Sequence, residues 1–200
     1  MLDNFVWFEG IPFPSFDICY ETIKDVRDNF VINDDDVFTV GYPKSGNNWV
    51  VEIICLIISK GNPKWSQSVP IWDRSPWIET DYGHKLISEA ERPLLSSSHL
   101  PFQLFPKSFF SSKAKVIYIM RNPRDILVSG FHFWNSFKSN SDVTSLEQYS
   151  ERFLQGNVPW GSWFEHVRGW LSMRGRENFL VLTYEEMQKE SLGIGRLTSL

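Results

Sequence analysis

The sequence predicts an α/β fold in which a central parallel sheet is flanked by helices on both faces. Short β-rich runs alternate with stretches of helical periodicity, and two of these runs lead through a turn directly into a helix. The composition agrees, because 42% of the 200 residues are hydrophobic and 22% are charged, which is far too apolar for a disordered chain. We expect one domain over residues 1–190 and a separate tail over residues 191–200.

The first half of the chain contains the clearest strand–turn–helix unit. Residues 20–30 carry apolar side chains at helical spacing and end at an acidic turn. Residues 37–41 are predicted to form a strand and residues 42–46 a turn. Residues 48–60 are predicted to form a buried helix, which a glycine and a proline then end.

The second half repeats this pattern with shorter signals. Strands are expected over residues 94–99, 115–120 and 178–184, the first of them at an edge of the sheet. A helix is expected after the second of these strands, with Pro123 in its first turn. Residues 62–93 are expected to be rich in loops and to carry three tryptophans.

Charge and cysteine content limit the classes of partner. The net charge of −4 and the pI near 5.6 give no overall field for nucleic acid or an anionic membrane, so an anion site must be local. The two cysteines, Cys19 and Cys55, are too few for a disulfide framework, and they do not have the spacing of a zinc site. This indicates a reducing compartment. The N-terminus lacks signal-peptide features, and the apolar run at residues 50–58 is too short to span a bilayer. We expect a cytoplasmic protein without a metal.

The segment GYPKSGNNW, between the first strand and its helix, is the strongest chemical signal in the sequence. Loop N–H groups and a helix N-terminus form a cradle for an anion, and Lys44 adds a positive charge. Gly41 and Gly46 reproduce the glycine spacing of a P-loop, but Asn47 and Asn48 stand where a nucleotide triphosphatase has its lysine and its Mg²⁺-binding hydroxyl. This disfavours a small-molecule kinase and favours transfer of a less charged sulfuryl group without a metal. An ordinary turn with a solvated lysine is the alternative.

A second signal lies at the end of the strand over residues 115–120. Arg121 follows this strand directly, at the edge where open α/β sheets bind ligands. Its planar guanidinium suits a phosphate, and Ser129, about two turns into the next helix, can add a hydroxyl. A surface ion pair and a solvated serine are the alternatives.

The resemblance of the chain to the cytosolic sulfotransferase family is carried by the stretches YPKSGNNW, RNPRDILVSGFHFW, GSWFEHVRGW and FLVLTYEEM. It narrows to the hydroxysteroid branch through WFEGIPFP and PIWDRSPWIET, and it runs from about Trp7 to Glu190. The resemblance implies a P-loop-like fold of three layers, with 3′-phosphoadenosine-5′-phosphosulfate as the donor. It also implies a hydrophobic alcohol, such as a hydroxysteroid or a bile acid, as the acceptor.

The resemblance further implies which residues bind the donor. Those expected to hold its 5′-phosphosulfate end are Lys44, Ser45, Gly46, Asn47, Asn48 and Trp49. Lys44 would also support the departing phosphate oxygen, and Trp49 would stack on the base. Arg121 and Ser129 would hold the 3′-phosphate, and Tyr184 would lie beside the adenine or its neighbouring contacts.

The acceptor side is also assigned through the resemblance. His99 falls at the position of the catalytic base, and a neutral imidazole can take the proton of a hydroxyl near pH 7. His132 is the rival by its proximity to Ser129, and a lone histidine is more often structural. The acceptor pocket is expected to be apolar, with a lining that includes Pro14, Trp72, Trp77 and Phe133, although such aromatic residues can equally belong to the core.

The resemblance stops before the last ten residues, and we expect parts of the family fold to be absent from this chain. These parts are the C-terminal helices, an Arg-Lys-Gly loop that completes the 3′-phosphate site, and the dimer motif. The alternative function is therefore a non-catalytic remnant that binds nucleotide weakly or pairs with full-length relatives. A homodimer stays open, whereas nucleic acid and membranes are not expected as partners.

Overall fold

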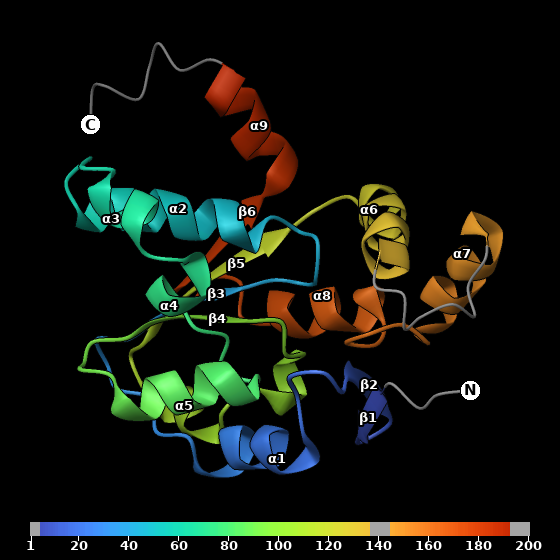
Figure 1. Cartoon of the computed structure of the whole chain (residues 1–200), viewed down its shortest axis with the longest axis horizontal. Helices are drawn as coiled ribbons and strands as arrows, with labels where there is room; N and C mark the ends of the chain where they lie inside the picture. The colour runs from blue at the N-terminus through green and yellow to red at the C-terminus, as the bar shows by residue number, and fades with distance from the viewer. Residues whose placement is uncertain (1–4, 137–144, 193–200) are drawn as a thin grey trace.

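Four parallel strands form the centre of the protein, in the order β4-β3-β5-β6 (Figure 1). The computed structural model describes residues 5–136 and 145–192, so most of the expected tail lies outside the described residues. The strands are β3 (Val37–Val40), β4 (Leu95–Ser98), β5 (Lys115–Met120) and β6 (Phe179–Thr183). All three pairings are parallel, which confirms the predicted α/β fold.

Helices connect and cover these strands. The longer ones are α1 (Tyr20–Asn29), α2 (Asn47–Ile58), α6 (Pro123–Ser136), α7 (Leu146–Gln155), α8 (Trp163–Leu171) and α9 (Tyr184–Leu192). Two short 3₁₀ turns, η1 (Phe102–Leu104) and η2 (Lys107–Ser111), lie between β4 and β5. No helix of the described ranges is long and apolar enough to cross a membrane.

Neighbouring residues of β5 show that both faces of the sheet are covered. The ring of Tyr118 stacks on His166 and Trp170 of α8, each with a centroid distance of 5.8 Å. The side chain of Ile119 lies against the backbone of Gly46, at the start of α2. Because successive side chains of a strand point to opposite faces, α8 and α2 lie on opposite sides of the sheet.

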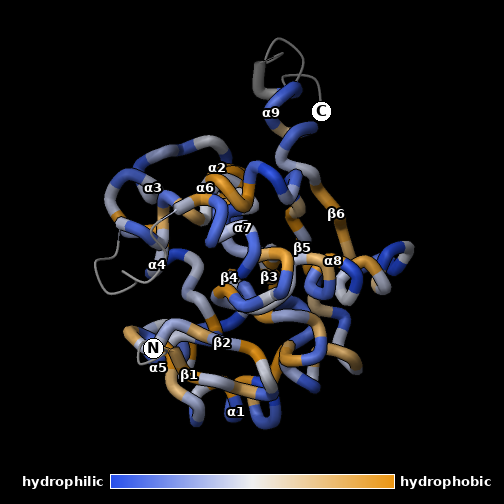
Figure 2. Tube along the Cα trace, turned by 90° about the vertical axis from the view of Figure 1, so that its right-hand side faces the viewer, coloured by the Kyte–Doolittle hydropathy of each residue, from blue (hydrophilic) through white to orange (hydrophobic). Residues whose placement is uncertain are grey.

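Apolar side chains of the strands make the centre of the core. Phe38, Val40 and Val116 are buried, as a parallel sheet covered on both faces requires. β6 is an edge strand of the sheet, and Figure 2 shows that most of it is hydrophobic. Leu180 of this strand is nevertheless exposed.

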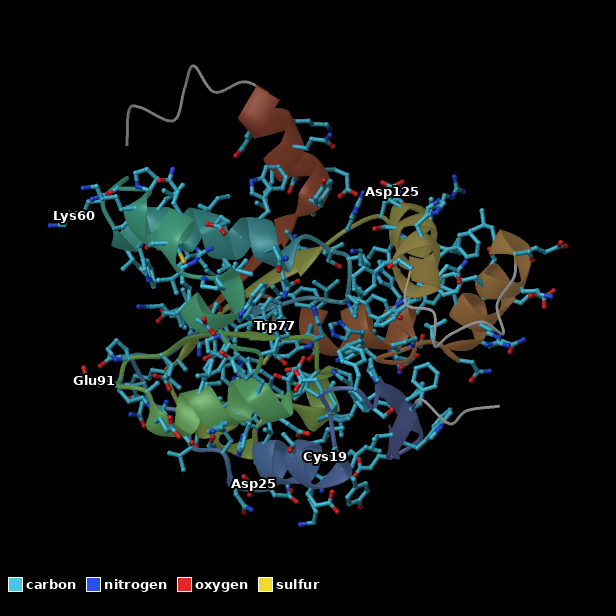
Figure 3. The ribbon with its side chains drawn as sticks, in the orientation of Figure 1. Cys19, Asp25, Lys60, Trp77, Glu91 and Asp125 are labelled. Atoms are coloured by element: carbon cyan, nitrogen blue, oxygen red, sulfur yellow. The ribbon has the colours of Figure 1, made fainter. Side chains whose placement is uncertain are left out.

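Two segments differ from the sequence-based expectation. Residues 62–93 are not mainly loops but contain α3 (Lys64–Ser68), α4 (Ile71–Arg74) and α5 (Asp81–Glu89). The last of these begins where the Thr80 hydroxyl accepts the N–H of Gly83 at 2.9 Å, an N-cap that the search for apolar periodicity missed. Trp77, between α4 and α5, pairs with β4 near the middle of the molecule (Figure 3).

The aromatic, proline-rich start of the chain forms a hairpin that the sequence analysis did not predict. Its strands are β1 (Phe5–Phe8) and β2 (Ile11–Pro14), joined by Glu9 and Gly10. Both turn residues have positive φ values, 48° and 79°, which match the twist that a two-residue hairpin needs.

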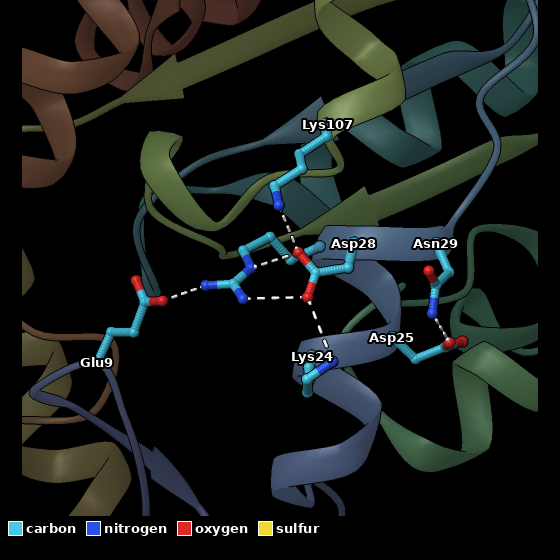
Figure 4. A network of polar contacts seen from close by, with 7 residues as sticks. Glu9, Lys24, Asp25, Asp28, Asn29 and Lys107 are labelled. Atoms are coloured by element: carbon cyan, nitrogen blue, oxygen red, sulfur yellow. Dashed lines mark hydrogen bonds and ion pairs between the residues drawn. The ribbon is translucent and has the colours of Figure 1, made fainter.

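A network of charges around the half-buried Arg27 and Asp28 ties this hairpin to α1 and η2 (Figure 4). The Asp28 carboxylate accepts hydrogen bonds from Arg27 at 3.0 and 3.1 Å and pairs with Lys107 at 2.7 Å and with Lys24 at 3.5 Å. Arg27 also pairs with Glu9 in the hairpin turn. Each charge of this network therefore has an opposite charge beside it.

Candidate active site

The carboxyl ends of the four parallel strands bring the predicted site residues to one edge of the sheet. Gly41 begins the loop after β3, and His99, Arg121 and Tyr184 directly follow β4, β5 and β6. The chain leaves β3 for β4 on one side and returns to β5 on the other. Such a switch in strand order is where open α/β sheets bind ligands.

The loop after β3 is shaped for close approach of a ligand to the backbone. Lys44 has φ of 71° and Gly46 has φ of 109°, so two of its residues are left-handed. A Cβ atom at Gly46 would lie 2.9 Å from the ring of Tyr184, so a side chain there would collide with it. The first turn of α2 contains no acidic residue and no side-chain cap, which leaves its N–H groups and its positive dipole end available to an anion.

Three buried polar atoms beside this loop have no hydrogen-bond partner among the described residues. They are Ser45 Oγ, Asn47 Oδ1 and Arg121 Nε. Buried polar atoms are paired in the great majority of cases, and the first and last of these can donate to an anion. The Asn47 amide nitrogen instead lies 3.5 Å from the carbonyls of Thr39 and Ser98, so its side chain faces the strands.

Two cations lie at the mouth of the loop without an ion pair in the described parts of the chain. Lys44 Nζ lies 4.0 Å from the ring centroid of Phe133, and the Arg121 guanidinium lies 4.1 Å from that of Tyr184. Arg121 also donates from Nη1 to the Lys44 carbonyl at 3.1 Å. Burial, and after it the charge of Arg121, lowers the pKa of Lys44. An anion between these two groups would oppose both effects, because a nearby negative charge favours the charged form of Lys44.

His99 is held in one tautomer by the same loop. Its Nδ1 lies 2.6 Å from the carbonyl oxygen of Gly41. Because a carbonyl can only accept, Nδ1 carries the hydrogen and Nε2 keeps its lone pair. Burial is the main cause that lowers the pKa of His99 to about 4, with the charge of Lys44 acting in the same direction. The imidazole is therefore neutral at pH 7 and able to accept a proton.

Aromatic rings surround His99, but only part of the predicted lining is among them. Trp77 and Trp160 lie 5.8 and 5.4 Å from the His99 ring, and Phe133 adjoins Lys44. Pro14 is buried at the end of β2 and Trp72 is 54% exposed on α4. Among the described residues, no ring contact or hydrogen bond joins either of them to His99.

The remaining residues that were predicted to bind the donor lie on α2, α6 and α9. The rings of Trp49 and Tyr184 lie 5.4 Å apart in an edge arrangement, and Asn48 is exposed in the first turn of α2. Ser129 is half-buried on α6 and has no hydrogen bond within the described residues, whereas His132 is exposed on the same helix. No three His, Cys, Asp or Glu side chains of the described chain gather where they could hold a metal ion.

Sequence reasoning missed three residues that touch His99. Glu79 accepts its N–H at 2.6 Å, His166 Nε2 lies 3.2 Å from its carbonyl oxygen, and Trp160 packs on its ring. The one signal for Glu79 was a charge within the aromatic stretch PIWDRSPWIET, and nothing in the sequence pairs His166 with His99.

Residues 34–193 match the family described as "Sulfotransferase domain". The chain belongs to the sulfotransferase family. It is 62% identical over 191 residues to "Sulfotransferase 2A1" of Macaca fascicularis and 60% identical over 194 residues to "3-beta-hydroxysteroid sulfotransferase" of Cavia porcellus. These alignments cover 96% and 97% of this sulfotransferase but 67% and 68% of the relatives, so the chain spans about two thirds of their length.

Solved structures agree with this membership. A mouse sulfotransferase, SULT7A1 complexed with PAP, superposes with a TM-score of 0.79 at 28% identity, over 96% of this chain and 66% of that one. A retinol dehydratase structure, at 21% identity and a TM-score of 0.78 over 87% of this chain and 61% of that one, supports the fold alone. The resemblance to hydroxysteroid sulfotransferases is confirmed, and the alternative of a non-catalytic remnant is not favoured.

Proposed function

We propose that this sulfotransferase moves a sulfuryl group from 3′-phosphoadenosine-5′-phosphosulfate to the hydroxyl of a hydroxysteroid or a related hydrophobic alcohol such as a bile acid. The class of acceptor is supported by the relative named as a 3-beta-hydroxysteroid sulfotransferase. The donor is supported by the mouse sulfotransferase structure that contains PAP. The buried, unpartnered Ser45 Oγ and Arg121 Nε fit a phosphate-bearing ligand of this kind.

The hydrogen bond between His99 Nδ1 and the Gly41 carbonyl carries this proposal. It attaches the proton acceptor to the first residue of the anion loop, three residues before Lys44. The free lone pair of Nε2 and the ammonium of Lys44 thus belong to one rigid unit at the ends of β3 and β4. A base and an electrostatic stabiliser in fixed relation are what a displacement at sulfur needs.

In the proposed mechanism His99 Nε2 takes the proton of the acceptor hydroxyl while its oxygen forms a bond to sulfur. The bond between sulfur and the bridging phosphate oxygen breaks, and the Lys44 ammonium stabilises the charge that develops on that oxygen. His99 leaves this step as an imidazolium, and its proton is then released to solvent. No step requires a metal ion, because the charge in flight is smaller than in phosphoryl transfer.

The nucleotide side of the proposal rests on four residues. The Arg121 guanidinium binds the 3′-phosphate, and Ser129 on α6 contributes a hydroxyl to it. The rings of Trp49 and Tyr184 lie where they can flank the base. The N–H groups at the start of α2 bind the 5′-phosphosulfate end.

On the acceptor side, Trp77, Trp160 and Phe133 provide an apolar wall for a flat alcohol. Pro14 and Trp72 stay predictions for a wider pocket. A cytoplasmic site of action is part of the proposal, on the family resemblance and the two free cysteines of the described chain. A homodimer is left open.

The first test is a thermal melt with adenosine 3′,5′-bisphosphate and, as the control ligand, ADP. A ligand that binds only the native state raises the melting temperature, and we expect a selective rise that Lys44→Ala and Arg121→Ala both reduce. A protein that melts cooperatively but shows no selective rise contradicts the proposed donor.

The second test is turnover with the donor and a 3β-hydroxysteroid, with the matched 3-keto steroid as the control. Mass spectrometry should detect a sulfated product only from the hydroxysteroid and only in the presence of the donor. Binding of the nucleotide without any product from the hydroxysteroid contradicts the proposed acceptor class.

A further inference from the structure

The peptide unit of His99 is held at both of its polar ends, in addition to the hydrogen bond that fixes its ring. Its N–H donates to Glu79, and its carbonyl accepts from His166. Neither partner has a part in the proposed mechanism, and each comes from a different part of the chain. These two hydrogen bonds restrict the position of the His99 backbone and therefore of its imidazole.

Glu79 reaches His99 because its segment runs beside β4. The N–H of Ile78 donates to the Ser97 carbonyl at 3.0 Å, and the N–H of Ser97 donates to the Pro76 carbonyl at 2.9 Å. With Trp77 paired to Ser97, the same parallel register places Glu79 opposite His99. The carboxylate Oε1 then accepts the His99 N–H at 2.6 Å.

The burial of Glu79 is costly for an anion. Its side chain has no exposed area, and Oε2 has no hydrogen-bond partner among the described residues. Desolvation raises the pKa of Glu79 to about 7, against the lowering effect of the hydrogen bond from His99. A protonated carboxyl tolerates this site better than a carboxylate, so a glutamine would reproduce the neutral form closely.

His166 holds the other end of the peptide from α8. Its Nε2 lies 3.2 Å from the His99 carbonyl, so Nε2 carries the hydrogen, and the Tyr118 hydroxyl donates to Nδ1 at 3.0 Å. Burial lowers the pKa of His166 to about 3, so its imidazole ring is neutral at pH 7. One turn further along the helix, Trp170 Nε1 donates to the Leu100 carbonyl at 3.0 Å. The helix therefore fixes two successive peptides.

We propose that Glu79 and His166 are positioning residues that clamp the His99 peptide from its two sides and so keep the imidazole within reach of Gly41, with Nε2 aimed at the acceptor. This inference rests on the proposed role of His99 as the base. Displacements of about 1 Å at a reacting group can cost about a hundredfold in rate. An Nε2–H tautomer would have no lone pair for the hydroxyl proton at all.

Kinetics of paired variants test the clamp. Glu79→Met and His166→Phe remove the acceptor and the donor, whereas Glu79→Gln and His166→Gln keep a polar group of similar reach. We expect kcat to fall about tenfold or more in the first pair with KM within about twofold, and to stay within about threefold in the second pair. Glu165→Met, on the exposed face of α8, is the matched control and should leave kcat unchanged.

Nitrogen-15 spectra of histidine-labelled protein give a readout that does not need turnover. The signals of His99 should report the Nδ1–H tautomer in the wild type and in the conservative variants, and a mixture of tautomers in the apolar ones. The His99 amide proton should also titrate near pH 7 in the wild type and not in Glu79→Gln. The titratable groups that act on His99 are Glu79, His166 and Lys44. Burial lowers the pKa of His166 to about 3, so this ring does not titrate near pH 7.

The proposal is overturned if the apolar variants melt cooperatively and keep both kcat and the wild-type tautomer, or if the conservative variants lose as much as the apolar ones. If the apolar variants do not fold, the wild-type tautomer decides, and an Nε2–H imidazole at His99 overturns the proposal. A wild type with the expected spectra but no turnover supports the clamp and contradicts the proposed function instead.

Discussion

Two clusters of positive charge in this sulfotransferase differ in how their charges are matched. In the network around Asp28, Arg27, Lys24 and Lys107 all have a carboxylate beside them (Figure 4). At the strand edge, Lys44 and Arg121 lie over aromatic rings, and the buried Nε of Arg121 has no hydrogen-bond partner in the described parts of the chain. Among the described residues, each cation of the first cluster has a carboxylate beside it, whereas neither cation of the second does.

The contrast separates a cluster whose charges are already matched from one that we propose binds an anion. Exposed ion pairs contribute little to stability, and their removal changes little else. Cations that face rings and each other raise the local potential, which an incoming anion lowers. Substitutions in the two clusters should therefore affect different quantities.

The largest effect is expected from Lys44→Met. In the proposed mechanism this ammonium stabilises the departing oxygen, so its loss should lower kcat about 100- to 1,000-fold while the melting temperature stays close to that of the wild type. Lys85→Met, at an exposed site on α5, is the control in the same steady-state assay. A variant of Lys44 with near-normal kcat would remove this residue from the chemistry.

Arg121→Gln should weaken binding rather than chemistry. A lost hydrogen bond to a charged group costs about 1.5 to 3 kcal/mol, so the Kd for adenosine 3′,5′-bisphosphate should rise about 10- to 100-fold in calorimetric titration. The neighbouring Arg124 is exposed on α6, and Arg124→Gln should leave the Kd unchanged. Equal losses in both variants would indicate a general field effect and not a contact.

Gly46→Ala should reduce stability through the loop itself. Its φ of 109° and the approach of Tyr184 to 2.9 Å of a new Cβ predict a loss of about 1 to 3 kcal/mol in the free energy of unfolding. Gly61→Ala is the matched control, because Gly61 also has a positive φ but has nothing within 4 Å of a new Cβ. The difference between their denaturation midpoints isolates the contact with Tyr184.

The smallest effect is expected from Asp28→Asn. Hydrogen bonds from Arg27, then from Lys107, hold the pKa of Asp28 well below its usual value. Its stabilising contribution is therefore present above about pH 4 and is lost as the pH falls toward the folded-state pKa. Thermal melts at about pH 6 and about pH 3 should show a small difference from wild type that shrinks at the lower pH. Nucleotide affinity should not change, and a changed Kd would contradict the separation of the two clusters.

The sequence predicted the elements whose side chains have a repeating pattern. The strand over residues 115–120 was predicted with the bounds of β5, because its six residues are β-rich and lie between loops. The hairpin at the start was missed because β2 contains two prolines and its partner β1 is only four residues long. α5 was missed because Gly83 and the nearby prolines obscured a short amphipathic period.

Candidate site residues could be proposed from the sequence where a short motif adjoins a predicted strand. Arg121 was predicted from its place at the end of a strand, where open α/β sheets bind ligands, and Lys44 from the glycine-containing loop after the first strand. His99 was predicted through the family resemblance alone. Glu79 and His166 lie 20 and 67 residues from His99 in sequence, and only the register beside β4 and the packing of α8 bring them to it. Contacts between residues so far apart in the chain cannot be inferred from a single sequence.

The order of the strands across the sheet also sets the order in which the candidate site residues lie along its edge. From β4 to β6, the strand ends present His99, Lys44, Arg121 and Tyr184 in turn. Neighbouring strands lie about 4.8 Å apart, so this row extends about 14 Å. Under the proposed function, the alcohol, the sulfur, the 3′-phosphate and the adenine lie in this order along the row. A donor bound in the reverse direction would place its sulfur too far from His99 to react.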